Sequence, residues 1–318
     1  MRIAFHSNQI GLRGTEVALY DYAHYNEELL GNESLIVYPK HAPGNDPKAL
    51  GRFLSRFNVH AYESFSEVDR LAEGANIDKF YAIKSGEKDG VLALGCDNLI
   101  HAVFPQKSDQ RHGHRYAFVS EWLSKHCSDG TTPFVPHIVS LPTTHYKLRA
   151  HLDIPEDAFV LGGYGGEDSF DVPFAPEAIR LALDKRPNLF FLFANFKPFI
   201  KHERVTFFPG TPNPQFKADL VEACDAMLHA RVLGESFGLA CGEFSIRNKP
   251  VITYGLSEQK SHLDILGEKA CKYYSASDLQ LFLEDLDHEY IKARNWDAYS
   301  EKCNPKSVMS QFVEVFLG

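Results

Sequence analysis

The sequence predicts an α/β protein of two similar halves, each a doubly wound parallel sheet with helices on both faces. Apolar runs of strand length alternate with amphipathic segments of helix length along most of the 318 residues. The alternation begins at the N-terminus and begins again after residue 150, and the chain is long enough for two cores. We therefore expect domains at residues 1–150 and 151–318, with a last helix at about 305–318 that is able to cross back to the first domain.

The first half opens with the apolar strand Arg2–His6 and a helix that follows a glycine-containing turn. Gly11 and Gly14 bracket this turn, and Thr15 is the candidate N-cap of the helix. The apolar stripe expected for the helix is Val17, Leu19, Tyr20 and Ala23. Further strand and helix patterns lie at residues 34–38, 57–62, 66–73, 79–86, 98–105 and 115–127. The glycine spacing, G-x-x-G, differs from the dinucleotide-binding pattern G-x-G-x-x-G, so no dinucleotide site is predicted.

The second half repeats the pattern after a proline-rich segment at residues 133–142, which we interpret as a strand end and domain crossover. Its first strand is Phe159–Tyr164. The predicted elements that follow are a helix at 176–185, strands at 189–194 and 205–208, a helix at 214–223, and strands at 226–229 and 250–254. Amphipathic helices at 277–286 and 305–316 complete the pattern.

The composition argues against several classes of protein. A formal net charge of −9 and a pI near 5.9 disfavour nucleic acid or an anionic membrane as the main partner. No apolar run approaches the roughly 20 residues that span a bilayer, and the N-terminus lacks the pattern of a signal peptide. Six scattered cysteines without a C-x-x-C pair are typical of reduced thiols, so we expect a cytoplasmic protein.

The most informative segment is Arg231–Tyr254, RVLGESFGLACGEFSIRNKPVITY. It contains Glu235, then Gly238 near an expected helix start, then a second carboxylate at Glu243 within that helix. A helix start offers free backbone N–H groups and a positive dipole end, which suit a phosphate. The two carboxylates can accept hydroxyl groups on either side of it. A loop that only connects a strand to a helix, without binding a ligand, explains the same residue pattern equally well.

The tract GESFGLACGE, followed by NKPVIT, resembles the E-x7-E signature of retaining family-4 glycosyltransferases of the GT-B fold. Two further segments resemble that family in the expected order. The loop Gly11–Glu16 is similar to its glycine-rich first loop, and Val205–Arg231 is similar to the series that precedes its first glutamate. The resemblance covers most of the second half and, more loosely, the first half.

The resemblance implies two Rossmann-like domains facing across a cleft and a nucleotide-sugar donor bound mainly to the second. Glu235 is then the catalytic carboxylate that holds hydroxyls of the transferred sugar, and Glu243 holds the ribose. Ser236, Phe237, Gly238 and Leu239 supply backbone N–H groups to the sugar and the diphosphate. His101 matches a histidine that touches the donor sugar from the first domain. In the first loop, Gly14 lies near the donor, and Thr15 and Glu16 are acceptor candidates.

The sequence departs from this family at the first loop of the second half. Residues 161–169, LGGYGGEDS, contain two acids and lack the Arg and Lys that bind the diphosphate in the family. Gly165 can still approach phosphate through its backbone. Lys197 and Arg231 are the candidate replacement cations, because both follow strand ends in the second half.

We therefore expect a metal-independent transferase that uses no cofactor. Its expected partners are a nucleotide-sugar donor and a glycan, lipid or small-molecule acceptor, with peripheral membrane contact left open. Nucleotide-sugar epimerase and phosphorylase activities, and a catalytically silent protein that binds a sugar nucleotide or a glycan, are the alternatives.

Overall fold

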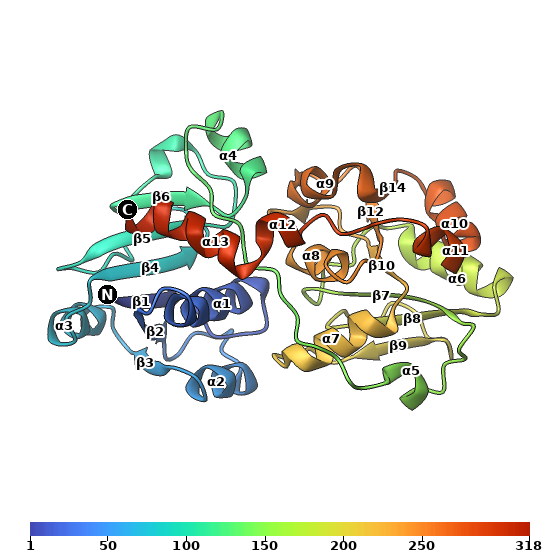
Figure 1. Ribbon diagram of the computed structural model, residues 1–318, viewed down its shortest axis with the longest axis horizontal. Coiled ribbons are helices and arrows are strands. Elements are labelled where there is room, and N and C mark those ends of the chain that lie inside the picture. Colours follow the sequence, from blue (N-terminus) through green and yellow to red (C-terminus); the bar gives the residue numbers. More distant parts are fainter. The chain divides into compact units, whose positions relative to one another are not determined.

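The computed structural model describes residues 1–318 and divides them into two compact units. Unit 1 comprises Met1–Ile138 and Lys302–Gly318, and unit 2 comprises Val139–Glu301 (Figure 1). Each unit contains one six-stranded sheet whose strand pairs are all parallel. The boundary expected near residue 150 falls in the short helix α5 (Leu148–His151), inside unit 2.

The sheet of unit 1 has the strand order β3-β2-β1-β4-β5-β6, so its direction of growth reverses between β1 and β4. Its strands are β1 (Arg2–Ser7), β2 (Glu33–Pro39), β3 (Asn58–Tyr62), β4 (Lys79–Lys84), β5 (Asp97–Ala102) and β6 (Arg115–Phe118). Its helices are α1 (Gly14–Glu28), α2 (Pro47–Leu54), α3 (Ser66–Gly74), the 3-10 turn Ser108–Gln110 and α4 (Glu121–Ser128). The central strands are buried on both faces because helices cover the sheet, which explains their continuous apolar runs.

The start of α1 differs from the sequence prediction. The N-cap is Arg13, whose backbone is extended and whose side chain makes no capping hydrogen bond, and Thr15 lies inside the first turn. Thr15 as N-cap is therefore wrong, because a cap at Thr15 requires the helix to begin at residue 16, whereas α1 begins two residues earlier, at Gly14. The buried face also turns relative to the expected stripe, and its residues are Glu16, Ala18, Leu19, Tyr22, Ala23 and Asn26.

The end of the chain belongs to unit 1. Helix α12 (Ser300–Cys303) leads into α13 (Pro305–Phe312) and a π-helical turn, Val313–Leu317. The ring of Phe312 is fully buried and lies 5.4 Å from the rings of both Tyr22 and Tyr81. The red helix α13 accordingly lies against the sheet of unit 1 in Figure 1.

The sheet of unit 2 has the order β14-β12-β10-β7-β8-β9, with its reversal between β10 and β7. The strands are β7 (Phe159–Tyr164), β8 (Leu189–Ala194), β9 (Val205–Phe208), β10 (Ala226–His229), β12 (Val251–Tyr254) and β14 (Ala270–Tyr273). Two short strands, β11 (Gly234–Glu235) and β13 (Gln259–Lys260), form a separate parallel pair. The helices are α5, α6 (Ala175–Lys185), α7 (Pro214–Ala223), α8 (Leu239–Ser245), α9 (Ser261–Leu266), the 3-10 turn Gly267–Lys269, α10 (Ala276–Asp285) and α11 (His288–Lys292).

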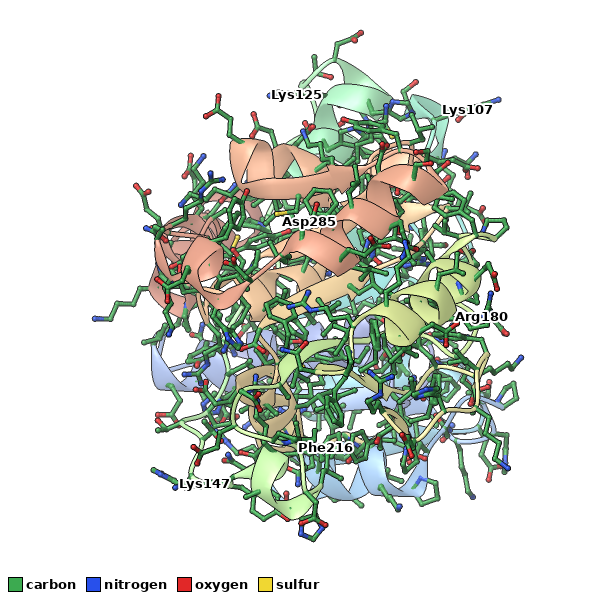
Figure 2. All side chains as sticks on the ribbon, turned by 90° about the vertical axis from the view of Figure 1, so that its right-hand side faces the viewer. Lys107, Lys125, Lys147, Arg180, Phe216 and Asp285 are labelled. Carbon is green, nitrogen blue, oxygen red and sulfur yellow. The ribbon has the colours of Figure 1, made fainter.

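Helices α6 and α10 bury their apolar faces in the core of unit 2 and carry charges on the opposite side. Arg180 extends from α6 into solvent, where it pairs with Glu177 at 2.6 Å (Figure 2). Asp285 ends α10, whereas Asp287 caps α11 by accepting a hydrogen bond from the backbone of Tyr290 at 2.7 Å. The sequence Asp285-Leu286-Asp287 thus connects the end of α10 to the start of α11. No helix in the structure is long and apolar enough to cross a membrane.

The packing of Phe312 generates a stability prediction for unit 1. Phe312→Ala should lower the free energy of unfolding by about 3–5 kcal/mol, because it removes a fully buried ring and leaves a cavity. Val313→Ala, at a side chain that is 37% exposed, should cost less than about 1 kcal/mol. Urea unfolding followed by Trp122 fluorescence in a Trp296→Phe background reports on unit 1 alone, since the chain has 2 tryptophans. Equal losses in the two variants would contradict the packing described.

Candidate functional site

The candidate site lies at the carboxyl edge of the unit 2 sheet, beside the reversal of strand order. Open parallel sheets bind ligands at this edge, because the loops on either side of the reversal diverge there. Tyr164 ends β7 and His229 ends β10, on the two sides of the reversal. The segment with Glu235 and Glu243 follows β10 directly.

Glu235 is held by a chain of hydrogen bonds that starts inside the unit. Its Oε1 lies 3.2 Å from His229 Nε2 and 2.9 Å from Arg231 Nη1. His229 Nδ1 lies 2.9 Å from Thr253 Oγ1, which lies 3.0 Å from His262 Nε2. Two neighbouring strands and α9 therefore fix this one carboxylate.

The donors in this chain follow from the carboxylate at its end. An ionised carboxylate only accepts, so His229 Nε2–H donates to Glu235. With this one proton on the ring, Nδ1 is an acceptor. Thr253 then donates to His229 and accepts from His262 Nε2–H. Every group from His262 to Glu235 has one consistent role, which fixes the orientation of the carboxylate.

The surroundings keep Glu235 ionised. Burial alone raises the pKa of its carboxyl, but the hydrogen bond from His229 and the charge of Arg231 outweigh burial and lower the pKa to about 2. Burial, together with the neighbouring His229, lowers the pKa of His262 to about 3, so that ring is neutral. The side chain of Glu235 is 24% exposed, and its Oε2 makes no hydrogen bond within the protein. This oxygen is free to accept a hydroxyl from a ligand.

The loop after Glu235 has little freedom to change. Gly238 is the N-cap of α8 and has φ +91°, a conformation that favours glycine. A Cβ at this position would lie 2.7 Å from His262 Cβ. Phe237 is buried, and its carbonyl accepts a hydrogen bond from the hydroxyl of Tyr299 at 3.4 Å. The packing thus fixes the backbone of the predicted donor-binding residues Ser236 to Leu239, whose role in binding stays a prediction.

Glu243 belongs to a different network from Glu235. It is almost fully buried in α8, where its Oε2 accepts a hydrogen bond from the hydroxyl of Tyr164. Its Oε1 lies 3.5 Å from Nζ of Lys217, a residue of α7. Burial and the neighbouring carboxylate raise the pKa of Tyr164 far above its usual range, which keeps the hydroxyl a donor. Both carboxylate oxygens of Glu243 therefore already have a partner within the protein, and the predicted ribose contact stays a prediction.

The two cations proposed to replace the missing phosphate ligands differ in their surroundings. Arg231 lies in the site and binds Glu235. Lys197 forms a 2.6 Å ion pair with Asp168, and both side chains are more than half exposed, so solvent screens the pair. Gly165 packs against Phe196, and its carbonyl accepts a hydrogen bond from Asn195 at 2.6 Å. Of the two candidate cations, the structure places only Arg231 in contact with Glu235.

His101, the predicted sugar contact from the first domain, is fully buried in this structure, and its role stays a prediction. His101 lies on β5 in the interior of unit 1, with no exposed surface. Its Nδ1 lies 2.6 Å from the hydroxyl of Tyr81, and its Nε2 lies 2.9 Å from the carbonyl of Val135. Burial lowers its pKa to about 4, so the ring is neutral at physiological pH. Both ring nitrogens of His101 are therefore engaged by groups inside unit 1, Tyr81 and Val135.

The early-loop residues also lie in unit 1. Gly14 is exposed, Thr15 is partly exposed, and Glu16 is buried in the first turn of α1. Oε2 of Glu16 is buried without a hydrogen-bond partner, and burial raises the pKa of this carboxyl. Their contacts with donor or acceptor stay predictions.

Sequence reasoning missed the side chains that position the two glutamates. His229 carried a usable signal, because it is the last residue of a predicted strand immediately before the motif. Thr253 also lies within a predicted strand, but only its pairing with His229 across the sheet shows its role. Nothing in the sequence connects His262 or Lys217 to this site.

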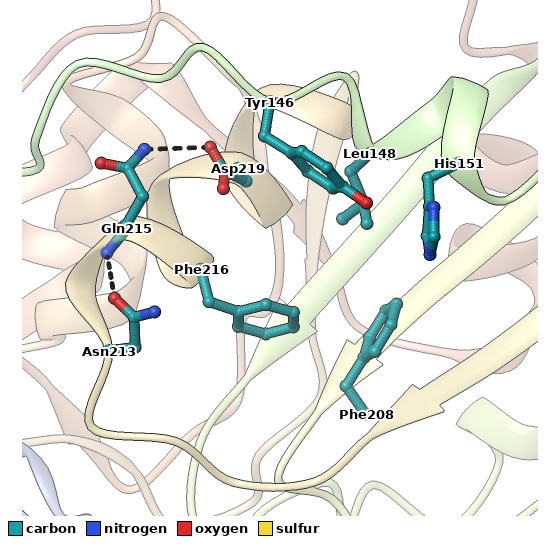
Figure 3. Close-up of a pocket in the computed structure, with 8 residues that line it drawn as sticks. All are labelled: Tyr146, Leu148, His151, Phe208, Asn213, Gln215, Phe216 and Asp219. Atoms are coloured by element: carbon teal, nitrogen blue, oxygen red, sulfur yellow. Dashed lines mark hydrogen bonds between the residues drawn. The ribbon is translucent and has the colours of Figure 1, made fainter.

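Unit 2 also has a pocket of about 370 Å³ that contains none of the predicted site residues. Figure 3 shows the rings of Tyr146, Phe208 and Phe216 gathered around it. Three of its polar side chains already have partners, because Asn213 accepts from the backbone of Gln215 at 3.0 Å and the Gln215 side chain donates to Asp219 at 3.0 Å. The pocket therefore offers apolar surface more than directed hydrogen bonds, and the chemistry lies elsewhere.

A stability test follows from the low pKa of Glu235. A depressed carboxyl pKa contributes stability that is complete above the usual value of about 4.5 and is lost as pH falls toward 2. Lowering the pH from about 7 to about 3.5 should therefore cost the wild-type chain on the order of 1 kcal/mol more than Glu235→Gln. Trp296 fluorescence during urea unfolding, in a Trp122→Phe background, measures this in unit 2. The same loss in both proteins would show that Glu235 is not held as described.

No protein-family model matches the chain. A stretch of 110 residues is 32% identical to Avirulence protein A of Pseudomonas savastanoi pv. glycinea. The stretch covers 33% of this chain and 12% of that protein, so the match concerns a small part of the relative.

Solved structures resemble the chain over its whole length. HepE (Alr3699) of Anabaena in complex with UDP-glucose has 15% identity and a TM-score of 0.74, with 99% of this chain and 98% of that chain covered. WaaG, a glycosyltransferase involved in lipopolysaccharide biosynthesis, has 14% identity and a TM-score of 0.66, with 99% and 100% covered. A candidate UDP-N-acetylglucosamine 2-epimerase from Listeria monocytogenes has 10% identity and a TM-score of 0.61, with 99% and 96% covered. The chain has the two-sheet α/β architecture of these proteins, the GT-B fold.

Proposed function

We propose that the protein is a retaining glycosyltransferase that moves a sugar from a nucleoside diphosphate donor to a hydroxyl of a glycan, a lipid or a small molecule. The observation that carries the proposal is the state of Glu235. This carboxylate is ionised, is oriented by His229 and Arg231, and keeps one oxygen free at the carboxyl edge of a parallel sheet. Such an oxygen suits a sugar hydroxyl, and Arg231 beside it suits a diphosphate.

In this proposal unit 2 binds the donor. Glu235 accepts hydrogen bonds from hydroxyls of the sugar, and the backbone N–H groups of residues 237–239 face the sugar and the diphosphate. Arg231 supplies the positive charge that stabilises the leaving nucleoside diphosphate as its negative charge grows. Glu243 accepts a hydrogen bond from a ribose hydroxyl, and Lys217 and Tyr164 fix the position of its carboxylate.

The proposed reaction proceeds on one face of the sugar. The bond from the anomeric carbon to the leaving phosphate oxygen breaks, and the acceptor oxygen bonds to the same face of that carbon. The leaving phosphate oxygen takes the acceptor proton, so that atoms and charge balance without a protein nucleophile or a metal. The protein contributes position and electrostatic stabilisation.

The comparisons with solved structures support a nucleotide-sugar donor. HepE, which has the same fold over its whole length, was crystallised with UDP-glucose, so UDP-glucose is the first donor to test. The likeness to a candidate UDP-N-acetylglucosamine 2-epimerase supports an epimerase as the second function. The cytoplasmic location expected from the cysteine pattern remains part of the proposal.

Glu235→Gln tests the central residue while keeping its shape. Transfer to an acceptor, or slow hydrolysis of the donor, should fall by at least about a hundredfold, because the amide is neutral and donates where the carboxylate accepts. Glu222→Gln changes an exposed glutamate of α7 and serves as the matched control, with activity unchanged. Normal turnover by a folded Glu235→Gln variant, judged by circular dichroism, would contradict the proposed role.

Incubation with the donor alone separates transferase from epimerase. A thermal-shift screen of UDP-, GDP- and ADP-sugars first identifies the donor, because a bound ligand raises the unfolding temperature. We expect the identified donor to keep its sugar configuration until an acceptor is added, and the product to keep the anomeric configuration of the donor. Conversion of the donor to its epimer without an acceptor would identify the second function instead.

A further inference from the structure

A second polar cluster lies at the carboxyl edge of the unit 1 sheet, where the strand order reverses between β1 and β4. His6 is the penultimate residue of β1, and Lys84 is the last residue of β4. Asp89 reaches Lys84 from the loop of residues 85–96 that follows β4. By the same rule that locates the candidate site of unit 2, this edge is where unit 1 would bind a ligand.

Lys84 is a fully buried lysine at this edge. Its side chain has 0% exposure, and Nζ donates to Asp89 Oδ1 at 2.6 Å and to the carbonyl of Val91 at 3.2 Å. Burial lowers the pKa of Lys84, and the hydrogen bond to Asp89 opposes this effect. A buried ion pair is seldom more stabilising than apolar residues of the same size, so packing alone gives no reason for a lysine here.

His6 carries an unused hydrogen-bonding atom beside Lys84. Its ring is fully buried, its Nε2 lies 2.8 Å from the hydroxyl of Tyr62, and its Nδ1 has no partner. Burial lowers the pKa of His6 to about 3, with a further contribution from Lys84 and opposition from Asp89. If the Tyr62 hydroxyl donates to Nε2 of the neutral ring, Nδ1 carries the proton. The site then holds a buried donor without an acceptor.

Asp89 belongs to a loosely packed part of its loop. Residues 87–90 are all exposed, and the side chain of Asp89 is 30% exposed although its partner is fully buried. Nothing lies within 4 Å of the position that a Cβ at Gly90 would take. Asp89 Oδ1 also accepts a hydrogen bond from the backbone N–H of Val91 at 3.0 Å, so withdrawal of Asp89 would break this bond and leave Lys84 without its anion.

We propose that this edge of unit 1 is an anion site in which Lys84 and His6 Nδ1 bind a carboxylate or phosphate group of the acceptor. In the structure described, the carboxylate of Asp89 takes the place of that group on Lys84 only, and His6 Nδ1 has no partner. The role of the ligand as acceptor rests on the proposed transferase function, whereas the existence of the site does not.

Asp89→Ala empties the position that the anion should take. In a chloride buffer without oxyanions, the unfolding temperature of unit 1 should fall by roughly 5 °C, because a buried lysine loses its partner. Acetate or methyl phosphate at millimolar concentration should restore more than half of this loss, with saturation. Rescue by acetate alone identifies a carboxylate ligand, and rescue by methyl phosphate identifies a phosphate ligand. Trp122 fluorescence in the Trp296→Phe background follows unit 1.

Three variants complete the test. Glu63→Ala breaks an exposed ion pair of unit 1, Lys40–Glu63 at 2.8 Å, and should not respond to either anion. Lys84→Met combined with Asp89→Ala keeps the packing and should also lose the response. Asp89→Asn is the milder variant if Asp89→Ala does not fold, and it should respond in the same direction. No rescue, or equal rescue without Lys84, would overturn the proposal, and neither result depends on glycosyl transfer.

Discussion

The hydrogen-bond chain from His262 through Thr253 and His229 to Glu235 is the interaction on which the candidate site depends. A carboxylate at a partly buried edge needs compensation, and here the compensation comes from two strands of the sheet, from α9 and from Arg231. The chain passes through fixed secondary structure, so the free oxygen of Glu235 is held in place before any ligand arrives. The compact loop around Gly238 follows from the same requirement, since His262 leaves no room for a side chain there.

Each unit has a charged side chain near the carboxyl edge of its sheet that neighbouring groups compensate, and the sign of this charge differs between the two units. Each sheet reverses its strand order once, and each has charged side chains at the carboxyl edge beside the reversal. In unit 2 the buried partners are histidines, His229 and His262, and the negative charge at the edge is the carboxylate of Glu235. In unit 1 the buried charge is an ammonium group, Lys84, and a loop carboxylate neutralises it. One edge is therefore suited to hydroxyls beside a diphosphate, and the other to an acid group.

The sequence predicted those elements whose apolar pattern is compact and continuous. The predicted ranges of β7, β8, β9, β10 and α7 coincide with the structure. The four strands are continuous apolar runs, of which β9 is only partly buried, and α7 starts at a proline after a capping asparagine. The pattern did not reveal the elements α2, β14, β11 and β13. β14 is a four-residue edge strand, and β11 and β13 have two residues each, which is too short for any periodicity. At the site, the sequence located Glu235 and Arg231 together but did not reveal that His101 is buried, because burial on a central strand depends on what covers the sheet. Lys217 could not be foreseen, since only the packing of α7 against β7 brings it to Glu243.

The return of α13 to the first sheet makes unit 1 discontinuous along the chain. Residues 139–301 form a complete unit between two parts of another one, and Phe312 fills the core of that other unit only near the end of the sequence. During synthesis the N-terminal strands therefore emerge before unit 2 yet lack the packing partner α13 until that helix has followed unit 2 out of the ribosome. Unit 2, although encoded later, has all of its own residues first. The order of maturation is thus the reverse of the order of translation for the two units, and the N-terminal sheet must stay soluble in an incomplete state while its neighbour folds.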